Sequence, residues 1–401
     1  MSIKIQGARA ILADDVVETD LLVAEGRIAE IGGTAPGETV IDARGLMLAP
    51  ALVDVHGDAF ERQVMPRPSV FFPLEAALLE TDRQLAGNGI ATAYHALTLS
   101  WEPGLRSVDR GAAFIDALAA LAPRLTVENR VQLRWETFAF EAEALIERAL
   151  AGPVPTSVAF NDHTSISMRD RGVALQERLF EHNPAFAAAD PAAPGFAAYH
   201  ASTARRAGLE PEAYAARLVS IWERRAEVPE AIARIAALGR ARNVPMLSHD
   251  DTQDETRAFY RGLGARIAEF PMRKAVAETA RQAGDAVVFG APNVLRGGSH
   301  IGSPSAADMV EAGLCDILAS DYFYPAMLAA VARLHDERRA PLPALWSLVS
   351  AGPAAASGLT DRGMLAPGRR ADLVLIDWPE GAVPAVKLTL SAGRTAYRAM
   401  H

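Results

Sequence analysis

The sequence is nearly free of cysteine, since Cys315 is the single one among 401 residues. A lone cysteine cannot form a disulfide within the chain, and it cannot build a cysteine-based zinc cluster. If this protein binds a metal ion, histidine and carboxylate side chains must therefore hold it.

Basic charge and long apolar runs are also scarce. Lys and Arg number 40 against 49 Asp and Glu, and the resulting net charge of −9 argues against a nucleic-acid-binding surface. The sequence has no stretch of about 20 apolar residues, and its first residues, MSIKIQGARA, do not resemble a secretory leader. No G-x-G-x-x-G motif follows an apolar run and opens a helix, which excludes a Rossmann dinucleotide site. We therefore expect a cytoplasmic protein with no nucleic-acid or membrane partner.

What the sequence does contain is a regular alternation of short apolar runs with longer segments of helical spacing. Segments such as PLEAALLETDRQLAGN and PEAIARIAALGRAR separate the runs and place apolar residues on one helical face. Strands that alternate with helices pair in parallel through right-handed crossovers, and eight such units favour an α/β fold closed into a (β/α)₈, TIM-like barrel. The eight runs are ALVDVHGD, IATAYHALT, VQLRWETF, SVAFNDHT, VPMLSHDD, ARIAEFP, AVVFGAPN and CDILASDY.

The two ends of the chain follow another pattern. Residues 1–49 and 365–401 contain alternating apolar positions and turn glycines, as in VETDLLVAEGRIAEIGG and VKLTLSAGRTAYRA, and predict short antiparallel strands. Because chain termini often lie close together, we expect both ends to form one small β-sandwich domain beside a barrel of residues 50–364. The segment from 165 to about 227 is too long for an ordinary loop, and we expect it to form a helical lid over the site.

Polar residues at the ends of the predicted strands form the candidate site. The carboxyl ends of barrel strands face one cavity, so residues distant in sequence meet there. His56 and Asp58 are two positions apart and face the same side of a strand, as a chelating pair requires. Nitrogen and oxygen ligands suit Zn²⁺, Mn²⁺ or Fe²⁺, and a carboxylate such as Glu136 can bridge two ions. The convergent residues are His56, Asp58, Glu136, Asp162, His163, His249, Asp250, Asp251 and Asp321.

Each of these residues also has a purely structural interpretation. A single histidine at a strand end is more often a hydrogen-bonded core or surface residue than a ligand, so the predicted metal site rests on the convergence of several groups. Asp162, Asp250 and Asp251 also suit a supporting role in which they orient the neighbouring histidines. Three isolated histidines are interpreted first as structural, although the last lies in the insertion and could touch a substrate: His95, His182 and His200.

Arginines and glycines accompany these ligands along the sequence. Arg296 precedes the flexible Gly297 and Gly298, so this loop can present backbone N–H groups and a guanidinium fork to phosphate oxygens. Arg62 and Arg67 follow the first ligand pair in the sequence. The structural alternative is that Arg62 forms a salt bridge with a loop and Arg67 only stabilises a turn. The predicted substrate-binding residues are Arg62, Arg67, Arg296, Gly297, Gly298, Ser299 and His300.

Several of these motifs resemble the amidohydrolase superfamily, namely GRIAEIGG, LMLAPALVDVHGD and GRRADLVLID, with a His-x-Asp pair where most members carry His-x-His. HGDAFERQVMPRP, LRWE, NDHT, SHDDT, GAPNVLRGGSH and DILASDY together resemble the phosphonate-metabolism diphosphatases of that superfamily, over residues from about 45 to 325. The chain departs from them at residues 165–167 (SIS) and 301–303 (IGS), both on candidate binding loops. The resemblance implies that Glu136 bridges two metal ions and that the metal and catalytic residues are His56, Asp58, Glu136, His163, His249 and Asp321.

The activity that the resemblance implies is release of pyrophosphate from α-D-ribose 1-methylphosphonate 5-triphosphate or a related ribose 5-triphosphate. Activated water would attack the α-phosphorus, and Asp321 would take the proton of that water. The expected cofactor is one or two divalent metal ions, zinc first, with manganese or iron as alternatives. The expected partner is a small phosphorylated substrate, and the sequence leaves a homo-oligomer open.

Two other functions are compatible with the same sequence. The first is hydrolysis of an amide, cyclic amide or amidine on the same metal site, which leaves the three arginines without a role. The second is a binding protein on a barrel that has lost catalysis, and the presence of all six candidate ligands disfavours it.

Overall fold

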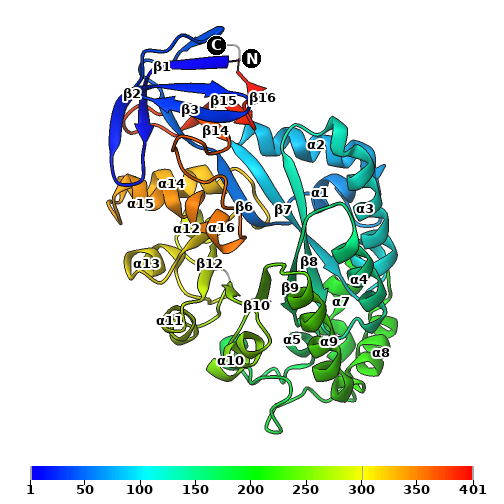
Figure 1. Ribbon diagram of the computed structural model, residues 1–401. Helices are drawn as coiled ribbons and strands as arrows, with labels where there is room; N and C mark the ends of the chain where they lie inside the picture. The colour runs from blue at the N-terminus through cyan, green and yellow to red at the C-terminus, as the bar shows by residue number, and fades with distance from the viewer. Residues whose placement is uncertain (1, 300, 400–401) are drawn as a thin grey trace.

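Eight parallel strands follow one another around a barrel in the computed structural model, which describes residues 2–299 and 301–399 (Figure 1). Gly57 pairs with Asp321 and so joins the last strand to the first. Each of the eight predicted runs forms one of these strands, and the predicted barrel is confirmed. The strands are β6 (Leu52–Gly57), β7 (Ile90–Leu99), β8 (Glu128–Glu136), β9 (Thr156–Asn161), β10 (Met246–His249), β11 (Ile267–Glu269), β12 (Ala286–Gly290) and β13 (Ile317–Ala319).

Amphipathic helices cover the outside of the barrel. In α3, the Ser107 side chain accepts a hydrogen bond from the Arg110 amide at the first turn, and Phe114, Leu118 and Leu121 recur at helical spacing and are buried. Within the described part of the chain, no helix combines the length and apolarity needed to cross a bilayer. The helices around the barrel are α1 (Glu61–Val64), α2 (Leu74–Gly87), α3 (Val108–Leu121), α4 (Glu143–Ala151), α9 (Val228–Ala241), α10 (Asp254–Gly262), α11 (Lys274–Gln282), α12 (Ala291–Arg296), α13 (Ala306–Glu311), α14 (Ala326–Asp336), α15 (Leu342–Ser347) and α16 (Ala351–Ala356).

The interior of the barrel is a packed apolar layer. Val55, Leu247, Ile267, Val288 and Ile317 come from five different strands and form one buried cluster. Because this layer fills the barrel, the polar side chains at the carboxyl ends of the strands stand on an apolar floor and not over an open channel.

Strands from both chain ends share a second sheet, drawn in blue and red in Figure 1. Successive residues of β14 face opposite sides of it, since Leu373 and Leu375 join the core of the sheet whereas Val374 and Ile376 pack with barrel residues. A small β-unit built from both termini is therefore confirmed, as one continuous sheet. Its strands are β1 (Ser2–Ile11), β2 (Val16–Ala24), β3 (Arg27–Ile31), β4 (Thr39–Asp42), β5 (Met47–Pro50), β14 (Leu373–Asp377), β15 (Ala385–Ser391) and β16 (Arg394–Arg398).

The insertion, residues 165 to about 227, is α-helical only at its start and from Phe196 onward. Pro184, Pro191 and Pro194 interrupt the part between, because proline removes a backbone donor and disfavours helix at the residue before it. The insertion lies against the strand-end face, where the Thr252 hydroxyl donates to the Arg178 carbonyl at 2.6 Å. Its α-helices are α5 (His163–Met168), α6 (Phe196–Tyr199), α7 (Ala201–Ala207) and α8 (Pro211–Trp222).

Glu128, at the start of β8, ties the C-terminal segment to the barrel. Its carboxylate accepts a hydrogen bond from Arg362 Nη1 at 2.7 Å and another from Arg370. Burial alone would raise the pKa of Glu128, but the charges of Arg130, Arg362 and Arg370 outweigh it and lower the pKa to about 2. Because Arg362 and Arg370 lie in the segment between α16 and β14, this network joins the second sheet to the amino end of the barrel.

Replacing Glu128 by Gln should lower the free energy of unfolding by roughly 1 to 3 kcal/mol at neutral pH, since three guanidinium groups lose an ionised partner. Urea unfolding measures this loss. The folded pKa of about 2 lies below the ordinary value of 4.5, so the contribution of Glu128 is complete above that value and is lost as the pH falls through the folded pKa. The gap between wild type and Glu128→Gln should therefore be smaller at about pH 4 than at neutral pH.

The exposed Asp116–Arg148 pair is the matched control, with side chains 61% and 52% exposed. Asp116→Asn should change the free energy of unfolding by less than about 0.5 kcal/mol. Equal effects of the two substitutions would contradict the anchoring role of Glu128.

Candidate active site

The backbone that joins the last strand to the first carries three of the predicted ligands. The Asp321 amide donates to the His56 carbonyl and the Asp58 amide donates to the Asp321 carbonyl, each at 2.9 Å. Asp321 has a φ of 55°, a left-handed conformation that is uncommon outside glycine and is found at functional sites. This junction brings ligand atoms of His56, Asp58 and Asp321 within 4.8 Å of one another.

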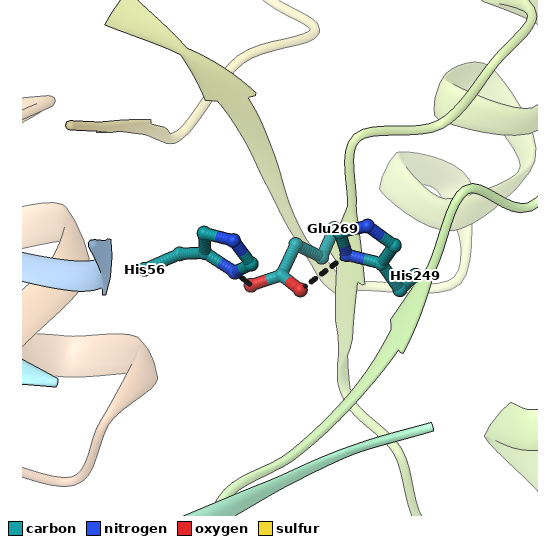
Figure 2. Close-up of side chains that lie close together, drawn as sticks. All are labelled: His56, His249 and Glu269. Carbon is teal, nitrogen blue, oxygen red and sulfur yellow. Dashed lines mark hydrogen bonds and ion pairs between the residues drawn. The ribbon is translucent and has the colours of Figure 1, made fainter. Parts of the chain in front are cut away.

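Glu269, at the end of β11, lies between two buried histidines (Figure 2). Its Oε2 is 2.7 Å from His249 Nδ1, and its Oε1 is 3.0 Å from His56 Nδ1. Burial would raise the pKa of Glu269, but His56 and His249 outweigh burial and hold that pKa well below its ordinary value. Glu269 is therefore ionised, and it holds each imidazole at Nδ1, which leaves Nε2 of His56 for another ligand.

The buried side chain of Arg134, on β8, places a fixed positive charge in the middle of this cluster. Its Nη2 is 2.8 Å from His249 Nε2, and its Nη1 is 3.5 Å from Asp58 Oδ2. Burial lowers the pKa of His249, so its neutral ring donates from Nδ1 to Glu269 and accepts at Nε2 from Arg134. A divalent ion bound to His249 and Asp58 would compete with this guanidinium for the same two atoms.

The carboxyl group of Asp321 has a pKa shifted to near neutral pH. Burial and then the negative charge of Asp58 raise the pKa of Asp321 to about 7, although His56 and Arg134 oppose the shift. Its carboxyl group can therefore hold or release a proton near neutral pH, and a bound cation would favour its ionised form.

Glu136 and His163 form a second set of polar groups beside the first. Glu136 Oε1 is 2.8 Å from His163 Nδ1, and Oε2 accepts from the His163 amide at 2.9 Å. Burial would raise the pKa of Glu136, but His163 outweighs it and lowers the pKa to about 2. His163 Nε2 lies 3.9 Å from Asp250 Oδ2. Glu136 thus reaches the cluster through His163.

The described residues form three overlapping groups with the composition and spacing of a divalent metal site, each with ligand atoms within 4.8 Å. His56 Nε2 is fully buried and has no hydrogen-bond partner among the described residues, a costly arrangement that a metal ion would relieve. Nitrogen and oxygen donors without sulfur suit Zn²⁺, Mn²⁺ and Fe²⁺. The residues present therefore fit a divalent ion. The groups are His56, His249 and Glu269; His163, His249 and Asp250; and His56, Asp58 and Asp321.

Arg296 and Gly298 line a cavity together with His249, Asp250 and Asp321. Helix α12 ends at Arg296, followed by Gly297 with a φ of 76° and Gly298 with a φ of 140°, conformations that favour glycine at both positions. Arg296 forms no ion pair with another described residue, so its charge is available to an anion in the cavity.

The other predicted binding residues are distributed differently. Ser299 lines the same cavity, whereas Arg62 on α1 and Arg67 are exposed and line neither of the two cavities beside the cluster. His300 lies outside the residues that the structure describes.

Two of the three aspartates considered as supporting residues, Asp162 and Asp251, have structural partners, whereas Asp250 belongs to a candidate ligand group. Asp162 Oδ1 accepts from the Ser165 amide at 2.8 Å and so caps α5, and its Oδ2 lies 3.3 Å from Arg178 Nη1. Asp251 accepts from the Ser248 hydroxyl in β10. The three isolated histidines belong to none of the groups formed by the described residues: His95, His182 and His200.

Comparison of the sequence with known proteins identifies the family of this chain. Residues 73–397 match the sequence profile of the amidohydrolase family. The chain belongs to the amidohydrolase family. It is 32% identical over 379 residues to the alpha-D-ribose 1-methylphosphonate 5-triphosphate diphosphatase of Escherichia coli (strain K12), which covers 92% of this chain and 94% of the relative. It is also 26% identical over 400 residues to an adenine deaminase of Methylobacterium sp. (strain 4-46), covering 97% of this chain and 57% of that protein.

Solved amidohydrolase structures share the fold. An amidohydrolase from an environmental sample of the Sargasso Sea superposes with a TM-score of 0.63 at 18% identity, covering 99% of this chain and 93% of the other. The N-isopropylammelide isopropylaminohydrolase of Burkholderia multivorans ATCC 17616 gives 0.62 at 18% identity, with 98% of each chain covered. A D-hydantoinase gives 0.60 at 14% identity, covering 99% and 95%. At such low identity these structures bear on the fold alone.

Glu269 and Arg134 are central to this site and are not among the residues predicted from the sequence. Glu269 ends the predicted strand ARIAEFP, so the rule that gathers polar residues at strand ends could have found it. Arg134 is two residues before Glu136 and faces the same side of β8, but ligand chemistry gives no reason to look for a cation among metal ligands.

We expect Glu269→Gln to lower the bound metal content, because the neutral amide no longer stabilises both imidazoles as metal ligands. A roughly tenfold or larger loss of metal affinity is typical when such a partner is removed. Elemental analysis after dialysis and chelator competition measure it. Glu278→Gln, at an exposed position in α11, is the matched control and should keep the metal content of wild type. Full metal content in a folded Glu269→Gln protein would show that Glu269 does not organise the site.

Proposed function

We propose that this protein is a divalent-metal-dependent diphosphatase that releases pyrophosphate from α-D-ribose 1-methylphosphonate 5-triphosphate, or a related ribose 5-triphosphate, in phosphonate catabolism. The observation that carries the proposal is the position of Arg296, a cation without an ion-pair partner among the described residues, in the same cavity as His249 and Asp321. The 32% identity to the Escherichia coli diphosphatase supports the same substrate.

The proposed metal ligands are the six strand-end residues predicted from the sequence. Glu269 orients two of them, His56 and His249, through their Nδ1 atoms. One or two ions would bind, with zinc first and manganese or iron as alternatives. A bound divalent ion supplies a water molecule of lowered pKa and polarises a phosphoryl oxygen. The six residues are His56, Asp58, Glu136, His163, His249 and Asp321.

The protein's own side chains would accept the proton of the water and stabilise negative charge on the phosphates. Asp321, with its pKa raised to about 7 by burial and by Asp58, takes the proton of the attacking water. Arg134 and Arg296 line the cavity and would stabilise negative charge on the phosphoryl oxygens and on the departing pyrophosphate. The predicted N–H donors of this loop are not free, because the Gly297 amide donates to the Val294 carbonyl and the Gly298 amide to the Asn293 carbonyl, so the Arg296 side chain would supply the contacts to the anion.

Hydrolysis at carbon is the alternative, and the 26% identity to an adenine deaminase is the observation that favours it. A neutral substrate gives no ionic partner to Arg296, an exposed side chain that lines the cavity. Screening one metal-loaded preparation for pyrophosphate release and for ammonia release separates the two. Ammonia release from amides or amidines without pyrophosphate release from ribose 5-triphosphates would overturn the proposal.

Removing metal with a chelator should abolish pyrophosphate release, and adding back Zn²⁺, Mn²⁺ or Fe²⁺ should restore it. Asp321→Asn should reduce the rate about a hundredfold or more, because the amide cannot accept the proton. Elemental analysis and circular dichroism should show that this variant keeps part of its metal and its fold. Equal rates for the stripped and loaded enzyme would contradict the assigned site.

Arg296→Ala should reduce kcat/KM for the triphosphate about tenfold to a hundredfold, since it removes a charge-assisted fork to the leaving group. Inhibition by pyrophosphate should weaken to a similar degree, whereas metal content should not change. Arg124→Ala is the matched control, because Arg124 is exposed just before β8, at the opposite end of the barrel. If Arg296→Ala leaves both turnover and pyrophosphate inhibition intact, the phosphate role of this loop is wrong.

A further inference from the structure

We infer that a second cavity, on the far side of His163 from Arg296, binds the hydroxylated sugar end of the substrate and sets the preference for sugar triphosphates. Glu102, Thr98 and Tyr214 line this cavity. The inference rests on the proposed function, because it names the part of the molecule that selects among triphosphates.

The position of His163 connects the two cavities. His163 and Glu136 line the second cavity, whereas His249 and Asp250 line the first. The His163 and His249 rings meet edge to face with centroids 5.9 Å apart. A substrate with two chemically different ends can therefore lie across His163, with the reacting bond beside the ligand cluster and one end in each cavity.

The charges differ between the two cavities. In the second cavity, the Arg106 guanidinium makes a double hydrogen bond to Glu61 at 2.8 and 2.9 Å, and Arg206 lies 3.5 Å from Glu102. Both arginines there are thus compensated by carboxylates, whereas Arg296 in the first cavity forms no ion pair with a described residue. The triphosphate belongs with Arg296, and the ribose ring, whose hydroxyls carry no charge, belongs in the second cavity.

The wall of the second cavity is suited to sugar hydroxyls. Thr98 is buried at the end of β7, and its Oγ1 has no hydrogen-bond partner among the described residues. Glu102 is also buried, and its Oε1 accepts from the Tyr214 hydroxyl at 2.7 Å. A carboxylate offers about four acceptor positions, so Glu102 can accept further bonds, as acidic residues do from ribose diols. Trp101 and Ile166 supply the apolar part of the wall.

The insertion builds much of this cavity. Tyr214 comes from α8, and Thr203 and Arg206 come from α7. Burial and then the charge of Glu102 raise the pKa of Tyr214 far above its ordinary value, so its hydroxyl remains a donor that fixes Glu102. The insertion thereby acts on substrate choice through contacts separate from the ligand cluster.

The test compares metal-loaded full-length wild type with Thr98→Val and Glu102→Gln on two substrates, ribose 5-triphosphate and inorganic triphosphate. Both variants should lower the ratio of kcat/KM values, sugar triphosphate over inorganic triphosphate, by about fivefold to tenfold or more, because only the sugar substrate uses the lost hydrogen bonds. Thr98→Val is nearly isosteric and suits a strand, so it guards against a folding defect in Glu102→Gln. Thr395→Val in β16 and Glu278→Gln in α11 are the matched controls and should keep the wild-type ratio.

The outcomes separate this inference from the proposed function. Turnover of both triphosphates with an unchanged ratio in Thr98→Val and Glu102→Gln would overturn the sugar site and leave the diphosphatase intact. If neither triphosphate is hydrolysed, the proposed function fails, and titration with D-ribose 5-phosphate decides the sugar site alone. Weaker binding of that sugar phosphate to both variants than to the controls supports the site, and equal or absent binding overturns it.

Discussion

The active site depends on the way in which the barrel closes. The backbone hydrogen bonds between Asp321, His56 and Asp58 are the link between β13 and β6, and the side chains of the same residues form one of the candidate ligand groups. Asp54 is buried on β6, two residues before His56. It accepts hydrogen bonds from both the amide and the hydroxyl of Ser320 and so strengthens the same junction. Closing the barrel therefore places the ligands, so the geometry of the site is supported by the stability of the whole strand ring and not by mobile loops.

Closure also concentrates negative charge among buried and half-buried side chains. Asp58, Asp250, Asp321 and Glu269 lie around two histidines, and the structure offsets this charge in part with Arg134. Burial raises the pKa of Asp321, and the negative charge of Asp58 raises it further, because the repulsion between carboxylates this close opposes their ionisation. A divalent ion would resolve it more completely than a guanidinium, because it carries more charge and can contact several ligand atoms at once. Metal binding would therefore favour the ionised carboxylates of this cluster, and their ionisation would in turn favour metal binding.

The barrel could be predicted from the sequence because its signal is local and repeated eight times, as apolar strand runs separated by amphipathic helices. Residues such as His56 and His249 could be proposed as ligands because parallel strands carry their last residues to one face. The contacts within the face depend on the stagger and tilt of the strands, which no single run encodes. For that reason the sequence does not reveal that Glu269 bonds both histidines, that Arg134 sits between His249 and Asp58, or that Glu136 reaches the cluster through His163.

The division between a rigid centre and variable walls explains how one fold serves different substrates. The ligand cluster comes from strand ends that are fixed by barrel closure, whereas the two cavities take their remaining walls from the loop after α12 and from the insertion. A change in α8 can alter the contacts of Glu102 and Tyr214, and it can also reach His163, because α8 packs against α5, which begins at His163. In the proposed function, the strand ends supply most of the ligand cluster, and the surrounding segments select the bond that is presented to it.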